Sequence, residues 1–350
     1  MIRTLLRLVA VGLLLAVFVL GYAFWQQRAV VQQPLTLDEA MLLDVPVGST
    51  PVGLINRLER DGVLEGGLWL RLHWRLNRAG QTLQGGEYRL EPGMTVNDLF
   101  NDWVSGNVVQ YSLTLVEGWN IRQLRTALAA QGKLEQTLAG VDDVELMRRV
   151  GEPGMHPEGR FFPDTYRYVR GMRDIDVLIQ ANRRLKQVLA EEWALRADGL
   201  PYKNEYEALI MASIIEKETG VPAERGQIAG VFVRRLEKRM RLQTDPTVIY
   251  GMGDRYAGKI RRSDLREATP YNTYVISGLP PTPIAMVGRE AIRAAMQPEP
   301  GKTLYFVARG DGSHVFSTTL EEHVRAVREY QLRRRADYRS SPAPISKETP

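Results

Sequence analysis

The sequence of 350 residues contains no cysteine and only four histidines. The absence of cysteine excludes a disulfide framework, a thiolate nucleophile and any cysteine-ligated zinc or iron–sulfur site. The histidines are scattered, and none is paired with another at a spacing typical of metal ligands. They are His73, His156, His314 and His323. We therefore expect neither a metal nor a cofactor.

Several catalytic motifs are also missing. The sequence has no Gly-x-x-x-x-Gly-Lys-Ser/Thr, no Gly-x-Gly-x-x-Gly, no His-Glu-x-x-His and no Gly-x-Ser-x-Gly. None of its serines begins a Ser-x-x-Lys motif. These absences argue against phosphate-loop, dinucleotide, zinc-peptidase and serine-nucleophile enzymes, and they leave carboxylate chemistry as the main option.

The charge distribution argues against nucleic acid as a partner. The formal net charge is +5, but residues 1–28 contribute +3 and residues 333–350 contribute another +3, which leaves −1 for the body of the chain. A nearly neutral body with basic ends is not a phosphate-binding surface. The composition, 44% hydrophobic and 25% charged, is that of a globular protein.

Residues 8–25 form an uncharged apolar run of 18 residues. This length approaches the roughly 20 residues that a helix needs to cross a bilayer. A cleaved signal peptide is the alternative, but the run ends in Tyr22-Ala23-Phe24-Trp25, which suits an aromatic membrane interface better than a cleavage site. Because Arg3 and Arg7 precede the run, we expect residues 1–28 to form a single-pass anchor with a cytoplasmic N-terminus.

Beyond the anchor, the patterning predicts an α+β protein with two domains. A linker over residues 29–41 leads to a small mixed domain over 42–108, and a larger α+β domain occupies 109–336. In the small domain we expect strands near 43–47 and 85–90 and helices near 52–58 and 96–104. The small domain has no catalytic constellation, so packing and glycan binding by its aromatic residues both stay open. The polar residues 337–350 are expected to be disordered.

The larger domain contains a helix that is apolar nearly all round. Asn204 and Glu207 form a capping-box pattern that predicts the start of a helix over 205–219, and the apolar residues 208–215 predict that it is buried. We also expect helices over 120–131 and 173–194, a strand over 111–116, and a hairpin of 303–308 with 314–318.

Glu216 and Glu218 stand at the C-terminal end of this buried helix. Two residues apart on a helix are about 200° apart, so the pair does not face one reacting group, and we expect only one of them to point inward. Periodicity favours Glu218 slightly. A carboxyl group there is disfavoured from ionising by burial and by the helix dipole, as a general acid requires. A solvated helix end is the alternative.

Two later segments are rich in amide, hydroxyl and aromatic groups, which bind sugars well. They are residues 241–251 and 271–281, and their proline and glycine content predicts loops. Turn chemistry alone would also explain each segment.

Together these segments resemble the endolytic murein transglycosylase (MltG, YceG-like) family. The resemblance rests on Ala212-Ser213-Ile214-Ile215-Glu216-Lys217-Glu218-Thr219, Leu242-Gln243-Thr244-Asp245-Pro246-Thr247-Val248-Ile249-Tyr250-Gly251, Tyr271-Asn272-Thr273-Tyr274 and Gly278-Leu279-Pro280-Pro281. It is extended by Glu158-Gly159-Arg160-Phe161-Phe162-Pro163-Asp164-Thr165-Tyr166 and Ser313-His314-Val315-Phe316. The N-terminal anchor and the small domain, LysM-like in that family, fit as well.

The resemblance implies a lytic transglycosylase that cleaves the MurNAc-GlcNAc β-1,4 bond within nascent peptidoglycan strands and leaves a 1,6-anhydroMurNAc end. Its catalytic residue maps to Glu218, which acts first as acid and then as base, so that a second carboxylate is unnecessary. An ordinary glycosidase needs that second group. The expected substrate-binding residues are Gln243, Asp245, Tyr271, Asn272, Thr273 and Glu216.

Two other functions stay open. One is a muramidase-type hydrolase that uses Glu218 with Asp245, and the other is a non-catalytic scaffold that binds glycan. The resemblance further implies that the partners are peptidoglycan glycan strands, the membrane and peptidoglycan synthases (penicillin-binding proteins). It places the protein in the cytoplasmic (inner) membrane with its catalytic YceG-like domain on the periplasmic side.

Overall fold

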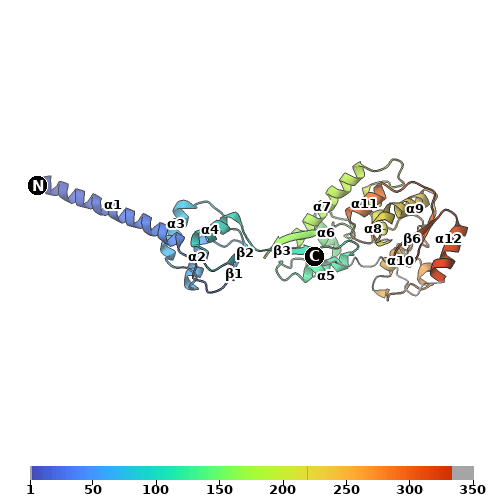
Figure 1. Ribbon diagram of the computed structural model, residues 1–350, viewed down its shortest axis with the longest axis horizontal. Helices are drawn as coiled ribbons and strands as arrows, with labels where there is room; N and C mark the ends of the chain where they lie inside the picture. The colour runs from blue at the N-terminus through green and yellow to red at the C-terminus, as the bar shows by residue number, and fades with distance from the viewer. Residues whose placement is uncertain (1, 219, 333–350) are drawn as a thin grey trace. The chain divides into compact units, whose positions relative to one another are not determined.

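The computed structural model describes residues 2–218 and 220–332 and divides the chain into two compact units (Figure 1). The first unit comprises Met1–Ser112 with two short segments, Gly132–Glu135 and Arg167–Arg173. The remainder of the chain forms the second unit. Helices mixed with short strands make up both, so the predicted α+β class is confirmed. The tail predicted over 337–350 lies outside the described residues.

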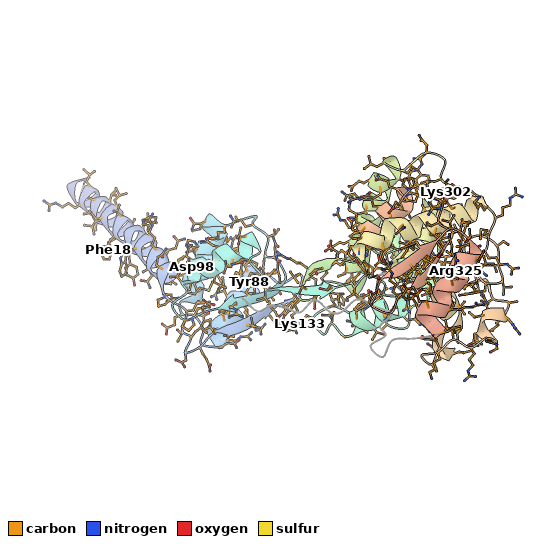
Figure 2. The ribbon with its side chains drawn as sticks, turned by 45° about the vertical axis from the view of Figure 1, so that its right-hand side comes forward. Phe18, Tyr88, Asp98, Lys133, Lys302 and Arg325 are labelled. Carbon is orange, nitrogen blue, oxygen red and sulfur yellow. The ribbon has the colours of Figure 1, made fainter. Side chains whose placement is uncertain are left out.

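The chain begins with one long helix, α1 (Ile2–Gln32). Its segment Leu6–Gln32 contains an apolar window of mean hydropathy 2.4, none of which is buried within the structure. Phe18, labelled in Figure 2, is 72% exposed. The helix is therefore long and apolar enough to cross a membrane, a property that signal sequences share.

The end of α1 belongs to the core of the first unit. Val30, Val31 and Leu35 are buried against the other apolar residues of that unit, and the Leu35 N–H donates to the Met94 carbonyl at 2.7 Å. The expected linker over 29–41 therefore contributes three side chains to this core.

The first unit is built on a two-stranded antiparallel sheet. Its elements are β1 (Met41–Val45), α2 (Pro51–Arg60), α3 (Gly67–Asn77), β2 (Gly86–Leu90) and α4 (Val96–Ser105). Leu43 of β1 lies opposite Tyr88 of β2, and both side chains are buried. Thr95 and Asp98 form a capping box that starts α4. The strands and helices predicted for this region are present.

Eight further helices and four strands follow in the described residues. They are β3 (Gln110–Thr114), α5 (Ile121–Ala129), α6 (Asp143–Val150), β4 (Thr165–Val169), α7 (Asp174–Ala194), α8 (Glu205–Glu218), α9 (Arg225–Glu237), α10 (Asp245–Met252), α11 (Arg289–Met296), β5 (Tyr305–Ala308), β6 (His314–Ser317) and α12 (Leu320–Val327). Short 3-10 turns cover Pro222–Glu224, Gly253–Arg255 and Asp264–Arg266, and a π turn covers Arg328–Leu332. The strands pair as β3 with β4 and as the predicted hairpin of β5 with β6.

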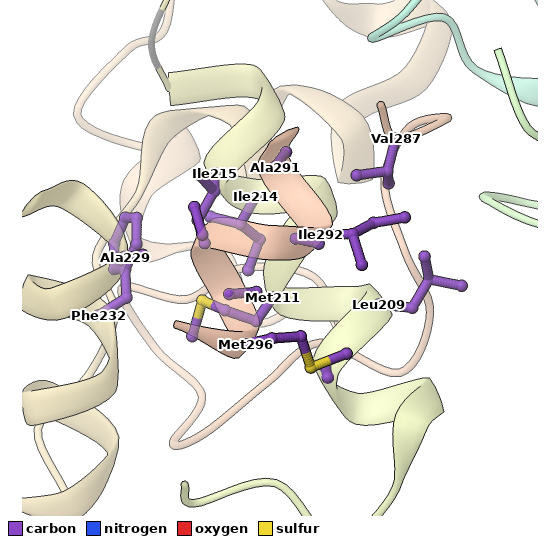
Figure 3. Close-up of a cluster of buried hydrophobic side chains, with 14 of the residues drawn as sticks. Leu209, Met211, Ile214, Ile215, Ala229, Phe232, Val287, Ala291, Ile292 and Met296 are labelled. Carbon is purple, nitrogen blue, oxygen red and sulfur yellow. The ribbon is translucent and has the colours of Figure 1, made fainter. Parts of the chain in front are cut away.

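Helix α8 is the centre of the second unit. All of its residues from Ala208 to Ile215 are buried, and it packs against α7, α9, α10 and α11. Figure 3 shows Ile214 and Met211 among side chains of α9 and α11, such as Phe232 and Ile292. The prediction of a helix buried on all sides is confirmed, and its apolar contacts fix the position of its C-terminal end.

The start of α8 is capped as the sequence predicts. The side chain of Asn204 accepts the Glu207 N–H at 3.0 Å. The Glu207 carboxylate reaches back one residue further than in a capping box and accepts the Lys203 N–H at 2.8 Å.

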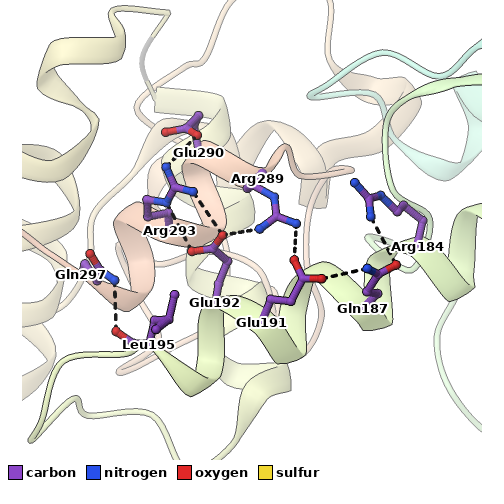
Figure 4. Close-up of polar contacts among 9 residues, drawn as sticks. All are labelled: Arg184, Gln187, Glu191, Glu192, Leu195, Arg289, Glu290, Arg293 and Gln297. Carbon is purple, nitrogen blue, oxygen red and sulfur yellow. Dashed lines mark hydrogen bonds and ion pairs between the residues drawn. The ribbon is translucent and has the colours of Figure 1, made fainter.

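An ion-pair network joins α7 to α11 (Figure 4). Glu192 of α7 is almost completely buried and accepts from Arg289 at 2.7 Å and from Arg293 at 3.3 Å. Arg289 also pairs with Glu191. Because α11 begins at Arg289, this network fixes the N-terminus of a helix that contacts α8.

One expectation for this unit is wrong. Residues 241–251 were expected to form a loop, but their second half is helix α10. Thr244 is the extended residue before the helix, and Pro246 lies in the first turn, where the missing N–H of proline has no partner to lose. The proline therefore marks the start of a helix and not a loop.

Candidate active site

The C-terminal end of α8 borders a cavity of about 1080 Å³ in the second unit. The turn before α10, the hairpin of β5 and β6, and helix α12 supply most of the other walls. The charged and histidine side chains that line it are Glu117, Glu216, Lys217, Glu218, Arg225, Arg235, Asp245, His314 and His323. Acidic and basic groups thus share one partly enclosed space.

Both glutamates of α8 line this cavity and both are half-buried, so the expectation that only one points inward is wrong. Glu216 accepts the Gly288 N–H at 3.1 Å, directly before α11. Burial and the neighbouring Glu117 raise the pKa of Glu216. A Cβ atom at position 288 would lie 1.9 Å from a Glu117 carboxylate oxygen, so a larger residue there would displace the exposed Glu117 side chain. Glu216 therefore ties α8 to α11.

Glu218 has a different environment. Its carboxylate accepts a hydrogen bond from the Thr244 hydroxyl, and no cation pairs with it among the described residues. Burial raises the pKa of Glu218 to about 7, and the nearby Asp245 adds to the rise, whereas the Thr244 hydroxyl and Arg235 oppose it. A carboxyl group with this pKa can both donate and accept a proton near neutral pH.

Thr273 stabilises the turn that contains Thr244 through two hydrogen bonds. Gln243 has a φ of 55°, an unusual value for a residue other than glycine, and its N–H donates to the Thr273 carbonyl at 3.2 Å. The next N–H, that of Thr244, donates to the Thr273 hydroxyl at 3.0 Å. Because Thr273 is fully buried, it holds this strained turn and with it the hydrogen bond to Glu218.

Asn272 and Tyr271 also bond within the protein. The buried Asn272 amide donates to the carbonyls of Asp264 and Glu267 at 3.1 and 2.7 Å, and its oxygen accepts the Tyr274 N–H at 3.0 Å. The Tyr271 hydroxyl lies 2.8 Å from that of Thr282. Neither residue, nor Thr273, is among the residues that line the cavity. These three residues therefore lie behind the cavity lining, where their polar groups bond to other parts of the protein.

Asp245 is exposed in the first turn of α10 and accepts the Tyr274 hydroxyl at 2.6 Å. Burial and this bond to Asp245 raise the pKa of Tyr274, which keeps the phenol protonated as a donor. Of the residues predicted from the sequence, the structure brings Glu216, Glu218, Gln243 and Asp245 to one cavity.

The opposite wall contains groups that the sequence analysis did not select. Arg235 is buried and donates to the carbonyls of Leu304 and Leu242, each at 2.7 Å. Its guanidinium lies 5.1 Å from the centre of the Tyr305 ring. His314 pairs through Nδ1 with Glu224 at 2.7 Å.

Some of these missed residues could have been selected from the sequence and others could not. Thr244, Tyr274 and His314 stand inside the quoted motifs, so their chemistry was visible there. Arg225 and Arg235 lie on α9, where no motif or composition signal points to a function. In the part of the chain that the structure describes, no group of three or more acidic or histidine side chains could hold a metal ion.

Comparisons with known proteins agree on one family. The model of the YceG-like family matches residues 43–329. An endolytic murein transglycosylase of Bacillus subtilis is 30% identical over 332 residues, which cover 89% of this chain and 91% of that protein. A protein of the same name from Streptococcus pneumoniae is 27% identical over 82% of this chain, which spans 57% of its length. A crystal structure of a YceG-like protein from Listeria monocytogenes superposes with a TM-score of 0.52 and 31% identity, covering 82% of this chain and 99% of that one.

Proposed function

The chain belongs to the YceG-like family, and on this premise we propose that it is an endolytic murein transglycosylase with Glu218 as its catalytic residue. The name and the length of the Bacillus relative support the activity, because that alignment covers 91% of the relative. The observation that supports the residue is the position of Glu218, which lines the cavity with a pKa of about 7 and makes no ion pair with another described residue.

The proposed reaction needs one carboxyl group. Protonated Glu218 gives its proton to the oxygen that leaves with GlcNAc C4 as the bond from that oxygen to MurNAc C1 breaks. The resulting carboxylate then takes the proton of the MurNAc C6 hydroxyl while the C6 oxygen bonds to C1. The product carries a 1,6-anhydroMurNAc end, and Glu218 regains its proton. No water is consumed.

The surroundings of Glu218 suit both halves of this cycle. The Thr244 hydroxyl donates to the carboxylate, which orients it and stabilises the form that accepts the proton. Asp245 acts in the opposite direction, because its charge favours the protonated form. We assign Glu216 a supporting role, since its carboxylate is bound to the Gly288 N–H.

A muramidase-type hydrolase is the second candidate, because Asp245 lines the same cavity as Glu218. In that reaction Asp245 would activate water or attack C1 itself. Against this role, Asp245 accepts the Tyr274 hydroxyl, which weakens it as a base or nucleophile. The two reactions leave different ends, so the products distinguish them.

Mass spectrometry of glycan strands digested with the purified protein tests this proposal. The wild type should release fragments with anhydro ends, and Glu218→Gln should release almost none. Glu216→Gln is the matched control: its amide oxygen can still accept the Gly288 N–H, and its fragments should keep anhydro ends. Reducing ends would support the hydrolase instead. Anhydro ends that persist in Glu218→Gln would overturn the assignment of the residue.

The remaining assignments complete the proposal. Helix α1 would anchor the protein in the cytoplasmic membrane, and the residues after α1 would lie outside the cytoplasm, near peptidoglycan synthases. The first unit would be a LysM-like module, supported by its β1-α2-α3-β2 order and its antiparallel sheet. Protease protection of α1 in spheroplasts would test the anchor, and glycan binding by a variant without residues 42–108 would test the module.

A further inference from the structure

Arg225 lines the cavity beside Glu218 and has no side-chain hydrogen bond or ion pair among the described residues. Its Nε atom is buried without a partner and is shielded from the cavity. Its terminal nitrogens are not among the buried unpartnered atoms of the described residues, so these N–H groups are accessible, and the side chain as a whole is half-buried. An accessible guanidinium group without a protein acceptor can bind a ligand in this cavity.

Arg225 lies on the Glu216 side of the cavity, at the first residue of α9. Its charge is close enough to lower the pKa of Glu216, although burial and Glu117 together raise that pKa. The Glu216 carboxylate is bound to the Gly288 N–H, and the adjacent Glu224 is bound to His314. Both neighbouring acids therefore have other partners, and the terminal N–H groups of Arg225 stay available.

His323 lines the same cavity with an aromatic ring. This ring stacks on Tyr305 with the centres 5.1 Å apart and the planes 21° apart. Burial and the nearby Arg235 lower the pKa of His323, so the ring is neutral near pH 7. The pair therefore adds no cation beside Arg225, and its ring surface suits the apolar face of a sugar.

We propose that Arg225 forms a subsite that binds a carboxylate group of the substrate glycan, beside the bond that is cleaved. This inference rests on the proposed function, because that function supplies a substrate with carboxylates. A guanidinium group presents a fork of N–H donors that matches a carboxylate, and it does so better than it matches a hydroxyl or an amide.

Peptidoglycan offers this carboxylate from two sources. The lactyl group of MurNAc has a free carboxylate where the stem peptide has been removed, and the stem peptide has carboxylates of its own where it is present. Chitin oligosaccharides have the same β-1,4 backbone without either. These three ligands separate recognition of the carboxylate from recognition of the sugar backbone.

Equilibrium binding by calorimetry tests the subsite without any cleavage. The full-length protein carries Glu218→Gln in every sample, and three matched oligomers are compared: peptide-free MurNAc-GlcNAc, the same oligomer with stem peptides, and chitin. Adding Arg225→Met should weaken binding of a carboxylate-bearing oligomer about tenfold or more and leave chitin unchanged. The oligomer that shows the loss identifies the source. Arg262→Met, which removes an exposed arginine outside the cavity, should change none of the three.

An equal loss for chitin, or no loss for either carboxylate ligand, would overturn the subsite. A ligand comparison covers the case in which Arg225→Met does not fold. The protein with native Arg225 should bind at least one of the two carboxylate-bearing oligomers about tenfold better than the same oligomer with its carboxylates converted to amides. None of these measurements depends on cleavage. The subsite can therefore fail while the transglycosylase assignment stands, and the transglycosylase assignment can fail while the subsite stands.

Discussion

Two glutamates of the second unit, Glu152 and Glu218, lie in opposite electrostatic environments. Burial disfavours the ionised form of Glu152, but hydrogen bonds from Lys186 at 2.5 Å and from Arg160 outweigh it, and the pKa of Glu152 is lowered. Glu218 has the Thr244 hydroxyl, a neighbouring acid and the charge of Arg235 without an ion pair, and burial raises its pKa to about 7. Burial acts in the same direction on both, so the partners decide the outcome.

A third glutamate, Glu158, has a raised pKa but lies outside the cavity. It is fully buried, and burial raises its pKa to about 7 although the Ile121 N–H donates to it at 3.1 Å. It is not among the residues that line the cavity. A raised pKa by itself therefore does not distinguish Glu218 from Glu158, and the position of Glu218 at the cavity does.

The largest expected effect separates Glu218 from Glu152 by activity. Glu218→Gln should lower turnover about 10³-fold or more, because the acid and the base are lost together. Glu152→Gln should keep turnover near that of the wild type. Release of anhydro-ended fragments, followed over time, measures both. Equal losses in the two variants would remove the distinction.

Glu152 should matter for stability, although it should not matter for turnover. Glu152→Gln leaves Arg160 without its carboxylate and should lower the free energy of unfolding by about 3 kcal/mol in urea denaturation. Glu145→Gln, which removes the more exposed pairs with Arg148 and Arg149, is the control and should lower the free energy of unfolding far less. A Glu152→Gln protein as stable as the wild type would contradict the role of its partners.

The pH dependence of stability should reveal the raised pKa of Glu218. The expected change is similar to or smaller than the loss of stability in Glu152→Gln. Its folded pKa of about 7 is above the ordinary value of 4.5, so the wild type loses stability as the pH rises between these values. Glutamine does not titrate. The free energy of unfolding of Glu218→Gln minus that of the wild type should therefore increase from pH 4 to pH 8, by up to about 3 kcal/mol. If this difference in free energy of unfolding does not change with pH, the pKa of Glu218 is not raised.

The smallest effects concern the two neighbours of Glu218. The reaction requires protonated Glu218, so kcat/KM should fall as the pH rises through about 7. Thr244→Val should lower kcat about tenfold and move this fall to higher pH, because the lost hydroxyl stabilised the carboxylate. Asp245→Asn should move it to lower pH by a fraction of a unit. Complete loss of activity in Asp245→Asn would favour the hydrolase.

Local sequence patterns predicted much of the second unit. The apolar run of residues 208–215 predicted a buried helix, and Asn204 with Glu207 predicted where it starts. The β5-β6 hairpin was equally visible in its alternation and turn residues. Helix α10 was missed, because Asp245 and Pro246 were taken for loop residues although both are favoured in a first helical turn.

The site was predictable only in part. Resemblance to the family selected Glu218, but periodicity left Glu216 nearly as good a candidate. Tyr271, Asn272 and Thr273 were expected to bind glycan, a role that stays a prediction, and the structure shows their polar atoms bonded within the protein. Amide and hydroxyl groups suit sugars and loop hydrogen bonds equally, so composition does not separate the two.

The α+β class, the apolar N-terminal helix, the burial of α8 and the family could all be inferred from the sequence, because each depends on residues near one another in the chain or on an ordered set of motifs. The groups that surround each glutamate became visible only in the folded structure. Gly288 lies 72 residues from Glu216 and Thr244 lies 26 from Glu218. A pKa depends on such contacts and on burial through space, and these exist only once the chain has folded.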